Sequence, residues 1–240
     1  MDRERIFDDF LERCKPREEF CGQGNPNSDI LIIGKEPYCK IECNEDENRK
    51  KRKENYDLCK DLRLRDAPRE GKQSPTWLNY QYLIDLIYER KIHEYRVDFE
   101  RFAFTTELNK LARPKARLDK ETKENIYERL LFFKESRFIQ SFPVVILACG
   151  NFIKNIREGD DRQIDNTFNA CYDKEIETPN GYYEFYTHYN LENTQLFKAG
   201  EKLIIHTRQL SNFRKGGGKQ LIEAMAEIIH NHLHDKLGLL

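Results

Sequence analysis

Residues 29–38 read DILIIGKEPY, and this stretch decides the fold class. Four consecutive apolar residues, three of them β-branched, end at Gly34, which is typical of a short buried strand. Three further segments have the same character: residues 101–106 (RFAFTT), 143–149 (PVVILAC) and 202–205 (KLII). Longer segments with apolar residues at helical spacing lie between them, so the sequence predicts strands that alternate with helices.

The helical segments are residues 2–13, 76–90, 122–139 and 218–237, where apolar residues recur three and four positions apart. A hairpin is predicted at residues 171–190, because Asn180-Gly181 separates two alternating runs. We therefore expect an α/β protein: a three-layer α/β/α fold with a central, mostly parallel four-stranded sheet, plus a small β-hairpin. One domain is expected to span residues 1–240, with the polar segment 39–74 as an insertion.

Charge and composition exclude several classes of protein. The chain has 41 Lys and Arg residues against 42 Asp and Glu residues, a formal net charge of −1, so any nucleic-acid surface must be local. The longest strongly apolar run, residues 144–149, is too short to cross a membrane. The first ten residues, MDRERIFDDF, lack the apolar centre of a secretory signal, and the seven cysteines follow no disulfide pattern. We expect a cytoplasmic monomer with free thiols, without a metal and without a cofactor.

Polar residues follow each predicted strand. Ligands of open α/β sheets bind beyond the carboxyl ends of the strands. Four short sequences occupy that edge: residues 34–38 (GKEPY), 106–110 (TELNK), 150–152 (GNF) and 206–211 (HTRQLS). We expect the carboxylate of Glu36 and the imidazole of His206 to face each other across one pocket at this edge.

Two of these sequences resemble motifs of the uracil-DNA glycosylase superfamily. Residues 34–38 are similar to the water-activating motif Gly-Gln-Asp-Pro-Tyr, and residues 206–211 match His-Pro-Ser-Pro-Leu-Ser at the first, fifth and sixth positions. The order also agrees, since one motif follows the first strand and the other follows the last. The resemblance implies a divergent member with a uracil-DNA glycosylase-like fold. It also implies a DNA-repair hydrolase that releases uracil, or a related damaged base, from DNA.

The resemblance assigns roles to individual residues. Glu36 would stabilise the cation that develops on the sugar and orient a water molecule, and His206 would stabilise the anion on the departing base. The residues expected to bind the substrate are Gly34, Lys35, Pro37, Tyr38, Glu107, Asn109 and Asn151. Those expected to bind DNA are Arg208, Leu210, Ser211, Arg214 and Lys215. Leu210 would be the wedge that enters the base stack when the nucleotide flips out.

Three positions differ from the family pattern. Glu107 stands where the family reads the base with Asn, and an ionised Glu offers only acceptors. Glu107 must therefore be protonated or read a base edge that presents donors, unless Asn109 reads the base instead. Thr207-Arg208-Gln209 replaces Pro-Ser-Pro and adds a cation. Lys35, beside Glu36, is expected to lower the pKa of that carboxylate.

Other interpretations of the same residues stay open. Leu210 can equally belong to the core, and Glu107 can form a structural ion pair with Lys110 or Arg113. The protein can be a catalytically silent nucleic-acid-binding member of the fold, or a hydrolase of free nucleosides, which would suit its neutral charge. Two basic segments favour nucleic acid. Residues 202–219 hold five Lys and Arg residues and no carboxylate, and residues 49–72 hold ten against five.

Overall fold

The four predicted strands form the parallel centre of one sheet in the computed structural model, which describes residues 3–61, 73–91, 97–155, 162–178, 184–211 and 218–239. These strands are β2 (Ile30–Gly34), β3 (Ala103–Glu107), β4 (Val144–Ala148) and β7 (Leu203–Thr207). The pairs β3–β2, β2–β4 and β4–β7 are all parallel. Nearly every residue in these strands is buried, as expected for parallel strands with helices on both faces.

Three more strands extend the sheet to seven, which corrects the predicted count of four. Their bounds are Gln23–Gly24 for β1, Cys171–Glu177 for β5 and Glu184–Tyr189 for β6. All three pair antiparallel, and the strand order is β1-β3-β2-β4-β7-β6-β5. The predicted hairpin is therefore not a separate element: β6 pairs with β7 and satisfies backbone groups that an edge strand would leave open. Its turn, Asn180-Gly181, lies outside the described residues.

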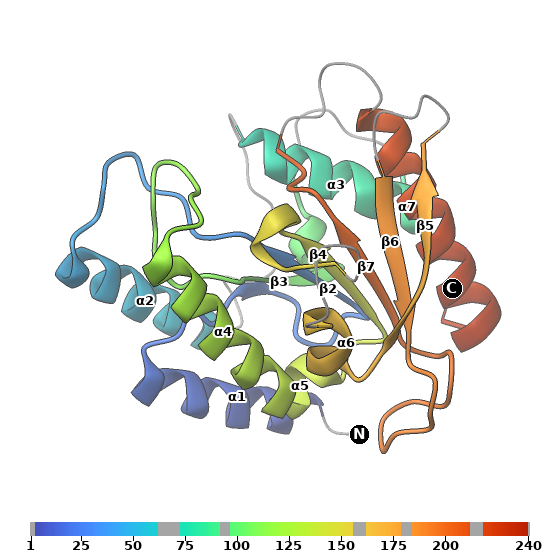
Figure 1. Cartoon of the computed structure of the whole chain (residues 1–240), viewed down its shortest axis with the longest axis horizontal. Coiled ribbons are helices and arrows are strands. Elements are labelled where there is room, and N and C mark those ends of the chain that lie inside the picture. Colours follow the sequence, from blue (N-terminus) through green and yellow to red (C-terminus); the bar gives the residue numbers. More distant parts are fainter. Residues whose placement is uncertain are drawn as a thin grey trace.

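Helices cover both faces of the sheet, as predicted (Figure 1). α3 (Pro75–Ile87) and α7 (Gly218–Asn231) pack together on one face. The other face is covered by α1 (Arg3–Arg17), α4 (Lys120–Glu135), α5 (Arg137–Gln140) and α6 (Gln163–Phe168). Shorter turns are the 3-10 helices Phe99–Arg101 and Gly150–Phe152, and a π-helical turn, His232–Lys236, follows α7.

The strands divide the interior into two cores by alternation. Along β2, Leu31 and Ile33 contribute to the core under α1 and α4, whereas Ile30 and Ile32 contribute to the core under α3 and α7. A shift of one residue in a strand therefore moves a side chain from one face of the sheet to the other.

The segment predicted as an insertion contains a further helix, α2 (Glu45–Lys60). Asn44 and Glu47 form a reciprocal capping box that starts this helix. α2 packs beside α1 and β1 at one end of the sheet (Figure 1). None of the described helices has the length and apolar character required to cross a membrane.

Candidate functional site

The winding of the chain reverses between β2 and β4. The connection from β2 to β3 passes through α3 on one face of the sheet, and β3 lies on one side of β2. The connection from β3 to β4 passes through α4 on the opposite face, and β4 lies on the other side of β2. Open α/β sheets bind ligands at such a point, beyond the carboxyl ends of the two strands. These ends are followed by Lys35-Glu36 and by Gly150-Asn151. The topology therefore favours the same edge as the sequence motifs.

Two segments continue side by side after β2 and β3 end. Backbone amides of Leu108, Asn109 and Arg113 donate to the carbonyls of Gly34, Lys35 and Pro37, at 2.9, 2.8 and 3.0 Å. Because this ladder holds residues 34–37 against residues 108–113, the side chains of Glu36 and Asn109 meet. Asn109 Nδ2 donates to Glu36 Oε2 at 2.9 Å. The other carboxylate oxygen, Oε1, is buried and has no hydrogen-bond partner.

Burial raises the pKa of Glu36, although the hydrogen bond from Asn109 and the charges of Arg113 and Lys35 oppose the rise. The charge of Lys35 lowers this pKa as expected, but burial outweighs it, so the net shift is upward. Lys35 does not pair with Glu36: its Nζ lies 3.4 Å from Asn151 Oδ1 and 4.9 Å from the centre of the Phe152 ring. Glu36 Oε1 is thus left buried and without a hydrogen-bond partner.

Glu107 lies beside Glu36 with its carboxyl group against Gly34. Gly34 and Glu107 are in register across β2 and β3, and a Cβ at Gly34 would lie only 2.3 Å from Glu107 Oε2. A side chain at position 34 would therefore require the carboxyl group of Glu107 to move. Burial and the nearby charge of Glu36 raise the pKa of Glu107 to about 8, so the group is protonated near neutral pH.

The structure does not show the alternative ion pairs for Glu107. Lys110 lies 4.0 Å from Glu128, and Arg113 binds Asp119 and Glu121 instead. Glu107 Oε2 is buried without a hydrogen-bond partner. A buried acceptor without a partner is costly, and a bound ligand that donates to it would remove that cost.

His206 has partners of its own. Its Nε2 lies 2.9 Å from the carbonyl oxygen of Gly150, and its Nδ1 lies 3.4 Å from Asn155 Nδ2. Burial lowers the pKa of His206 to about 4, so the ring is neutral near pH 7. With Nε2 as the protonated nitrogen, it donates to Gly150, while Nδ1 accepts from Asn155.

The expected meeting of Glu36 and His206 in one pocket stays a prediction, because the rows of the sheet in the described residues place His206 relative to Glu107 but not to Glu36. His206 is aligned across the sheet with Leu147, Ile33 and Thr106, one row before the pair formed by Gly34 and Glu107. Neighbouring rows point to opposite faces of a sheet. The side chains of Glu107 and His206 therefore leave opposite faces, and no hydrogen bond or ion pair joins His206 to Glu36.

The residues expected to bind DNA fall in different environments. Leu210 is completely buried in the core under α3 and α7, and its carbonyl accepts from Asn79 Nδ2 at 2.6 Å. This agrees with the interpretation of Leu210 as a core residue, because a buried side chain is not available to enter a base stack. Arg208 is exposed beside Gly150, and Ser211 is half-buried. Arg214 and Lys215 lie outside the described residues.

Two further expectations concern the surface of the site. Tyr38, expected to bind the substrate, is 72% exposed. Lys202, counted in the basic segment 202–219, is buried, and it precedes β7 at the opposite edge of the sheet from Glu36. The exposed basic surface near the site is therefore smaller than the sequence indicated.

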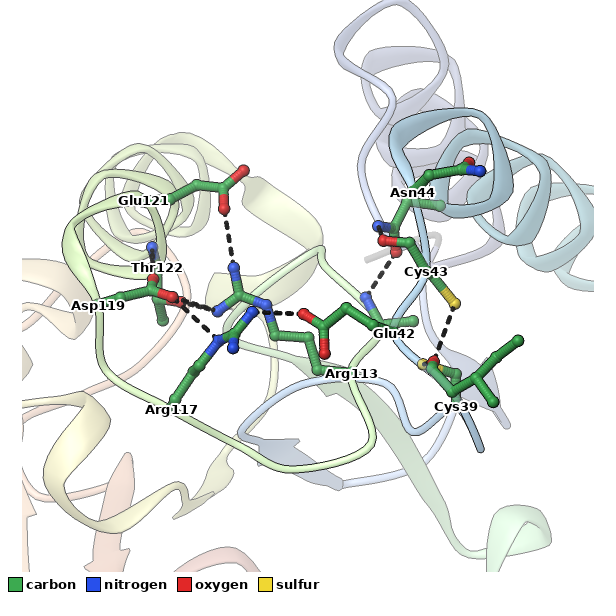
Figure 2. A network of polar contacts seen from close by, with 12 residues as sticks. Cys39, Glu42, Cys43, Asn44, Arg113, Arg117, Asp119, Glu121 and Thr122 are labelled. Atoms are coloured by element: carbon green, nitrogen blue, oxygen red, sulfur yellow. Dashed lines mark hydrogen bonds and ion pairs between the residues drawn. The ribbon is translucent and has the colours of Figure 1, made fainter.

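Sequence reasoning missed a polar network that joins the loop after β3 to the start of α4 and to Glu42 (Figure 2). The guanidinium of Arg113 is buried and binds Asp119 at 3.1 Å, Glu121 at 2.8 Å and Thr122 Oγ1 at 2.6 Å. Arg117 joins the same Asp119, at 3.1 Å, to Glu42. Charged residues in a loop carry no sequence signal for such pairing, because their partners are known only after folding.

Asp119 is the centre of this network, and we expect Asp119→Ala to destabilise the protein by about 1–2 kcal/mol. The carboxylate caps α4 by accepting from Thr122 N at 2.9 Å, and it also binds Arg113 and Arg117. The hydrogen bonds from Thr122, with help from Arg113, lower its pKa to about 2. Urea unfolding of the variant measures the loss. Asp46→Ala, which removes an exposed carboxylate from α2, is the control and should change stability by much less.

No group of three or more His, Cys, Asp or Glu side chains is placed to hold a metal ion in the described parts of the chain. The seven cysteines are free thiols. A scan against models of protein families and a search of curated proteins found no match to this chain. The function of this protein is therefore inferred from the geometry of the site.

Proposed function

We propose that this protein hydrolyses the N-glycosidic bond of uracil, or of a closely related base, in DNA. The observation that carries the proposal is the pair of carboxyl groups at the switch point of the sheet. Glu36 is held by Asn109 through one oxygen, its other oxygen is buried without a partner, and the neighbouring Glu107 has a pKa of about 8. Two adjacent carboxyl groups with different environments are a common way to place an acid and a base in one site.

Glu36 is the carboxylate of the proposed reaction. Cleavage of the bond between deoxyribose and a base builds positive charge on the sugar, which a nearby carboxylate stabilises. The same group can orient the attacking water and accept its proton. The amide of Asn109 holds one oxygen in place, so the second oxygen, which has no partner, is the one proposed to bind the water.

Glu107 is the proposed base-reading group, and its protonation removes the conflict with the family pattern. A protonated carboxyl group presents one O–H donor and one carbonyl acceptor, as an Asn amide presents one N–H donor and one acceptor. Uracil presents the complementary edge, with O4 as an acceptor and N3–H as a donor. Glu107 in its neutral form therefore suits the same base edge as Asn.

His206 is proposed to hold Gly150 in position. Its Nε2–H donates to the carbonyl of Gly150, which lies between Lys35 and Arg208. A direct contact of His206 with the base requires that this hydrogen bond be exchanged for one to the base. Lys35, whose Nζ lies near Gly150, and Arg208, whose backbone lies beside Gly150, are the proposed contacts for the DNA phosphates.

A base-release assay tests the proposal. Oligonucleotides that contain uracil, hypoxanthine or 5-hydroxymethyluracil are compared as single and double strands, with free deoxyuridine as a further substrate. We expect release from at least the uracil oligonucleotide and its loss in Glu36→Gln. Lack of release from every oligonucleotide would refute the proposal, and turnover of deoxyuridine alone would assign the site to free nucleosides.

A silent nucleic-acid-binding protein is the second candidate function. The observations that favour it are the burial of Leu210 and the engagement of His206 with Gly150. It predicts DNA binding that weakens with salt, without base release. Fluorescence anisotropy with the same oligonucleotides, at two salt concentrations, separates this function from the enzymatic one.

The pH dependence of base release should follow Glu107. Its folded-state pKa is raised, so the protonated form is present below about pH 8 and is lost as the pH rises through that value. Release by the wild type should therefore decline above about pH 8. Glu107→Gln keeps a donor and an acceptor in the same shape at every pH, so its activity should lack this alkaline decline. If the wild type and Glu107→Gln showed the same decline in base release at alkaline pH, Glu107 would not be the group that controls it.

A further inference from the structure

A second site lies at the opposite edge of the sheet from Glu36. A cavity of about 580 Å³ is bordered by the ends of α4 and α5, by α6 and by the loop of residues 190–202. Gln140 and Lys202 line it, and they precede the parallel strands β4 and β7. Small-molecule sites typically occupy about 300–1,000 Å³, so the cavity is large enough for a ligand of that class.

Lys202 is the unusual group in this cavity. Its side chain is only 3% exposed, and its Nζ donates to the backbone oxygen and to Oε1 of Gln140, at 3.1 and 2.8 Å. The rings of Phe168 and Phe197 lie 5.5 and 5.7 Å from Nζ. Among the described residues no carboxylate pairs with Lys202. A buried ammonium with neutral partners alone is costly, and an anion would remove much of that cost.

The other ionisable groups that face the cavity leave a surplus of positive charge. They are Lys134 and Glu135 of α4, Arg137 of α5, Arg162, Asp165 of α6 and Cys171 of β5. Both carboxylates already have partners: Glu135 binds Arg13 at 3.1 Å, and Asp165 lies 2.7 Å from His188 Nδ1. In the described part of the chain Lys134, Arg137 and Arg162 form no ion pair, so three cations border the cavity in addition to Lys202.

We propose that this cavity binds a small organic anion that carries a phosphate or carboxylate group on a flat apolar body. The ammonium of Lys202 is the counter-ion of the acidic group, Arg137 and Arg162 attract it from the surface, and Phe168 and Phe197 contact the apolar part. The site is separate from the one built on Glu36, so it stands or falls independently of the proposed hydrolysis.

Binding should depend on pH in a defined direction. Burial lowers the pKa of Lys202 to about 7, so the free site loses its ammonium as the pH rises above that value. An anion favours the protonated amine and raises the pKa of Lys202 when it binds. Affinity for a ligand of constant charge, such as benzoate, should therefore fall by about tenfold or more between about pH 6 and about pH 9.

Isothermal titration calorimetry tests the proposal with three anionic probes, which are AMP, benzoate and orthophosphate. Adenosine is the neutral counterpart of AMP. We expect AMP or benzoate to bind, adenosine to bind much more weakly, and the preference between AMP and benzoate to tell a phosphate ligand from a carboxylate one. Absence of binding by all three anions at millimolar concentration, or equal binding of AMP and adenosine, would overturn the proposal.

Variants locate the binding. Lys202→Met should abolish binding, and Arg137→Glu, which reverses an exposed charge at the cavity and leaves Lys202 in place, should weaken it by about tenfold or more. Lys219→Met removes an exposed lysine on α7 and should leave the affinity unchanged. Thermal unfolding confirms that each variant is folded. Wild-type affinity in both cavity variants would place the anion elsewhere and refute the site.

Discussion

Replacement of Glu36 by glutamine should lower the rate of base release from uracil-containing DNA by roughly 10²–10⁴-fold. The reason is the loss of a negative charge at the point where the sugar becomes positive, together with the loss of the proton acceptor for water. Glutamine keeps the shape of the side chain, and its oxygen can still accept from Asn109 Nδ2. The effect should therefore appear in catalysis and leave DNA affinity nearly unchanged.

Single-turnover rates on the uracil oligonucleotide measure this effect, and anisotropy measures the affinity. Glu124→Gln is the matched control, because Glu124 is an exposed glutamate on α4 that pairs only with Lys120 in the described structure. It should retain the wild-type rate. If Glu36→Gln also retained that rate, Glu36 would not be the carboxylate of the reaction.

Lys202→Met should stabilise the ligand-free protein at and below about pH 7. Burial lowers the pKa of Lys202 from 10.5 to about 7, so the folded state disfavours the ammonium that the unfolded chain keeps. Each unit of pKa shift corresponds to about 1.4 kcal/mol, which gives a penalty of roughly 4–5 kcal/mol where the amine is charged in both states. Methionine fills a similar volume without a charge, although it loses the hydrogen bonds to Gln140.

The advantage of the variant should shrink with pH in a known direction. Between about pH 7 and about pH 10.5 the unfolded state binds one more proton at Lys202 than the folded state, so wild-type stability from this group rises with pH. The difference between variant and wild type should fall by roughly 2–3 kcal/mol from about pH 6 to about pH 9.

Urea unfolding at both pH values measures this difference. Glu107, whose pKa is raised, contributes in the opposite direction below about pH 8, but its contribution is common to both proteins and cancels. Lys219→Met should show a small change that is the same at both pH values. A constant difference between Lys202→Met and the wild type would show that Lys202 does not titrate in this window.

The parallel centre of the fold was predictable because its signals are local. Runs such as Ile30–Ile33 and Val144–Ala148 are apolar without alternation, which indicates strands buried on both faces. Apolar spacing predicted α3 and the segment 122–139, which is divided at Ser136 into α4 and α5. The helices α2 and α6 were not predicted. The two-residue β1 carries no pattern that could have revealed it.

The candidate site was predictable in part. The motifs after β2 and β3 pointed to Glu36, Glu107 and Asn109, and the backbone ladder between residues 34–37 and 108–113 brings these three together. The place of His206 was not predictable, because it depends on a one-residue register between parallel strands. The sequence shows that His206 ends a strand but not which row of the sheet it occupies.

Local order along the chain was thus sufficient for the α/β class, the parallel strands and the edge of the sheet where polar residues gather. Packing alone settled three other matters: the face to which each strand-end side chain points, the protonation of Glu107 and the burial of Lys202. The physical reason is the distance along the chain over which each interaction acts. Strand and helix patterns depend on neighbours a few residues apart, whereas register, desolvation and charge pairing depend on segments that meet only when the chain is folded.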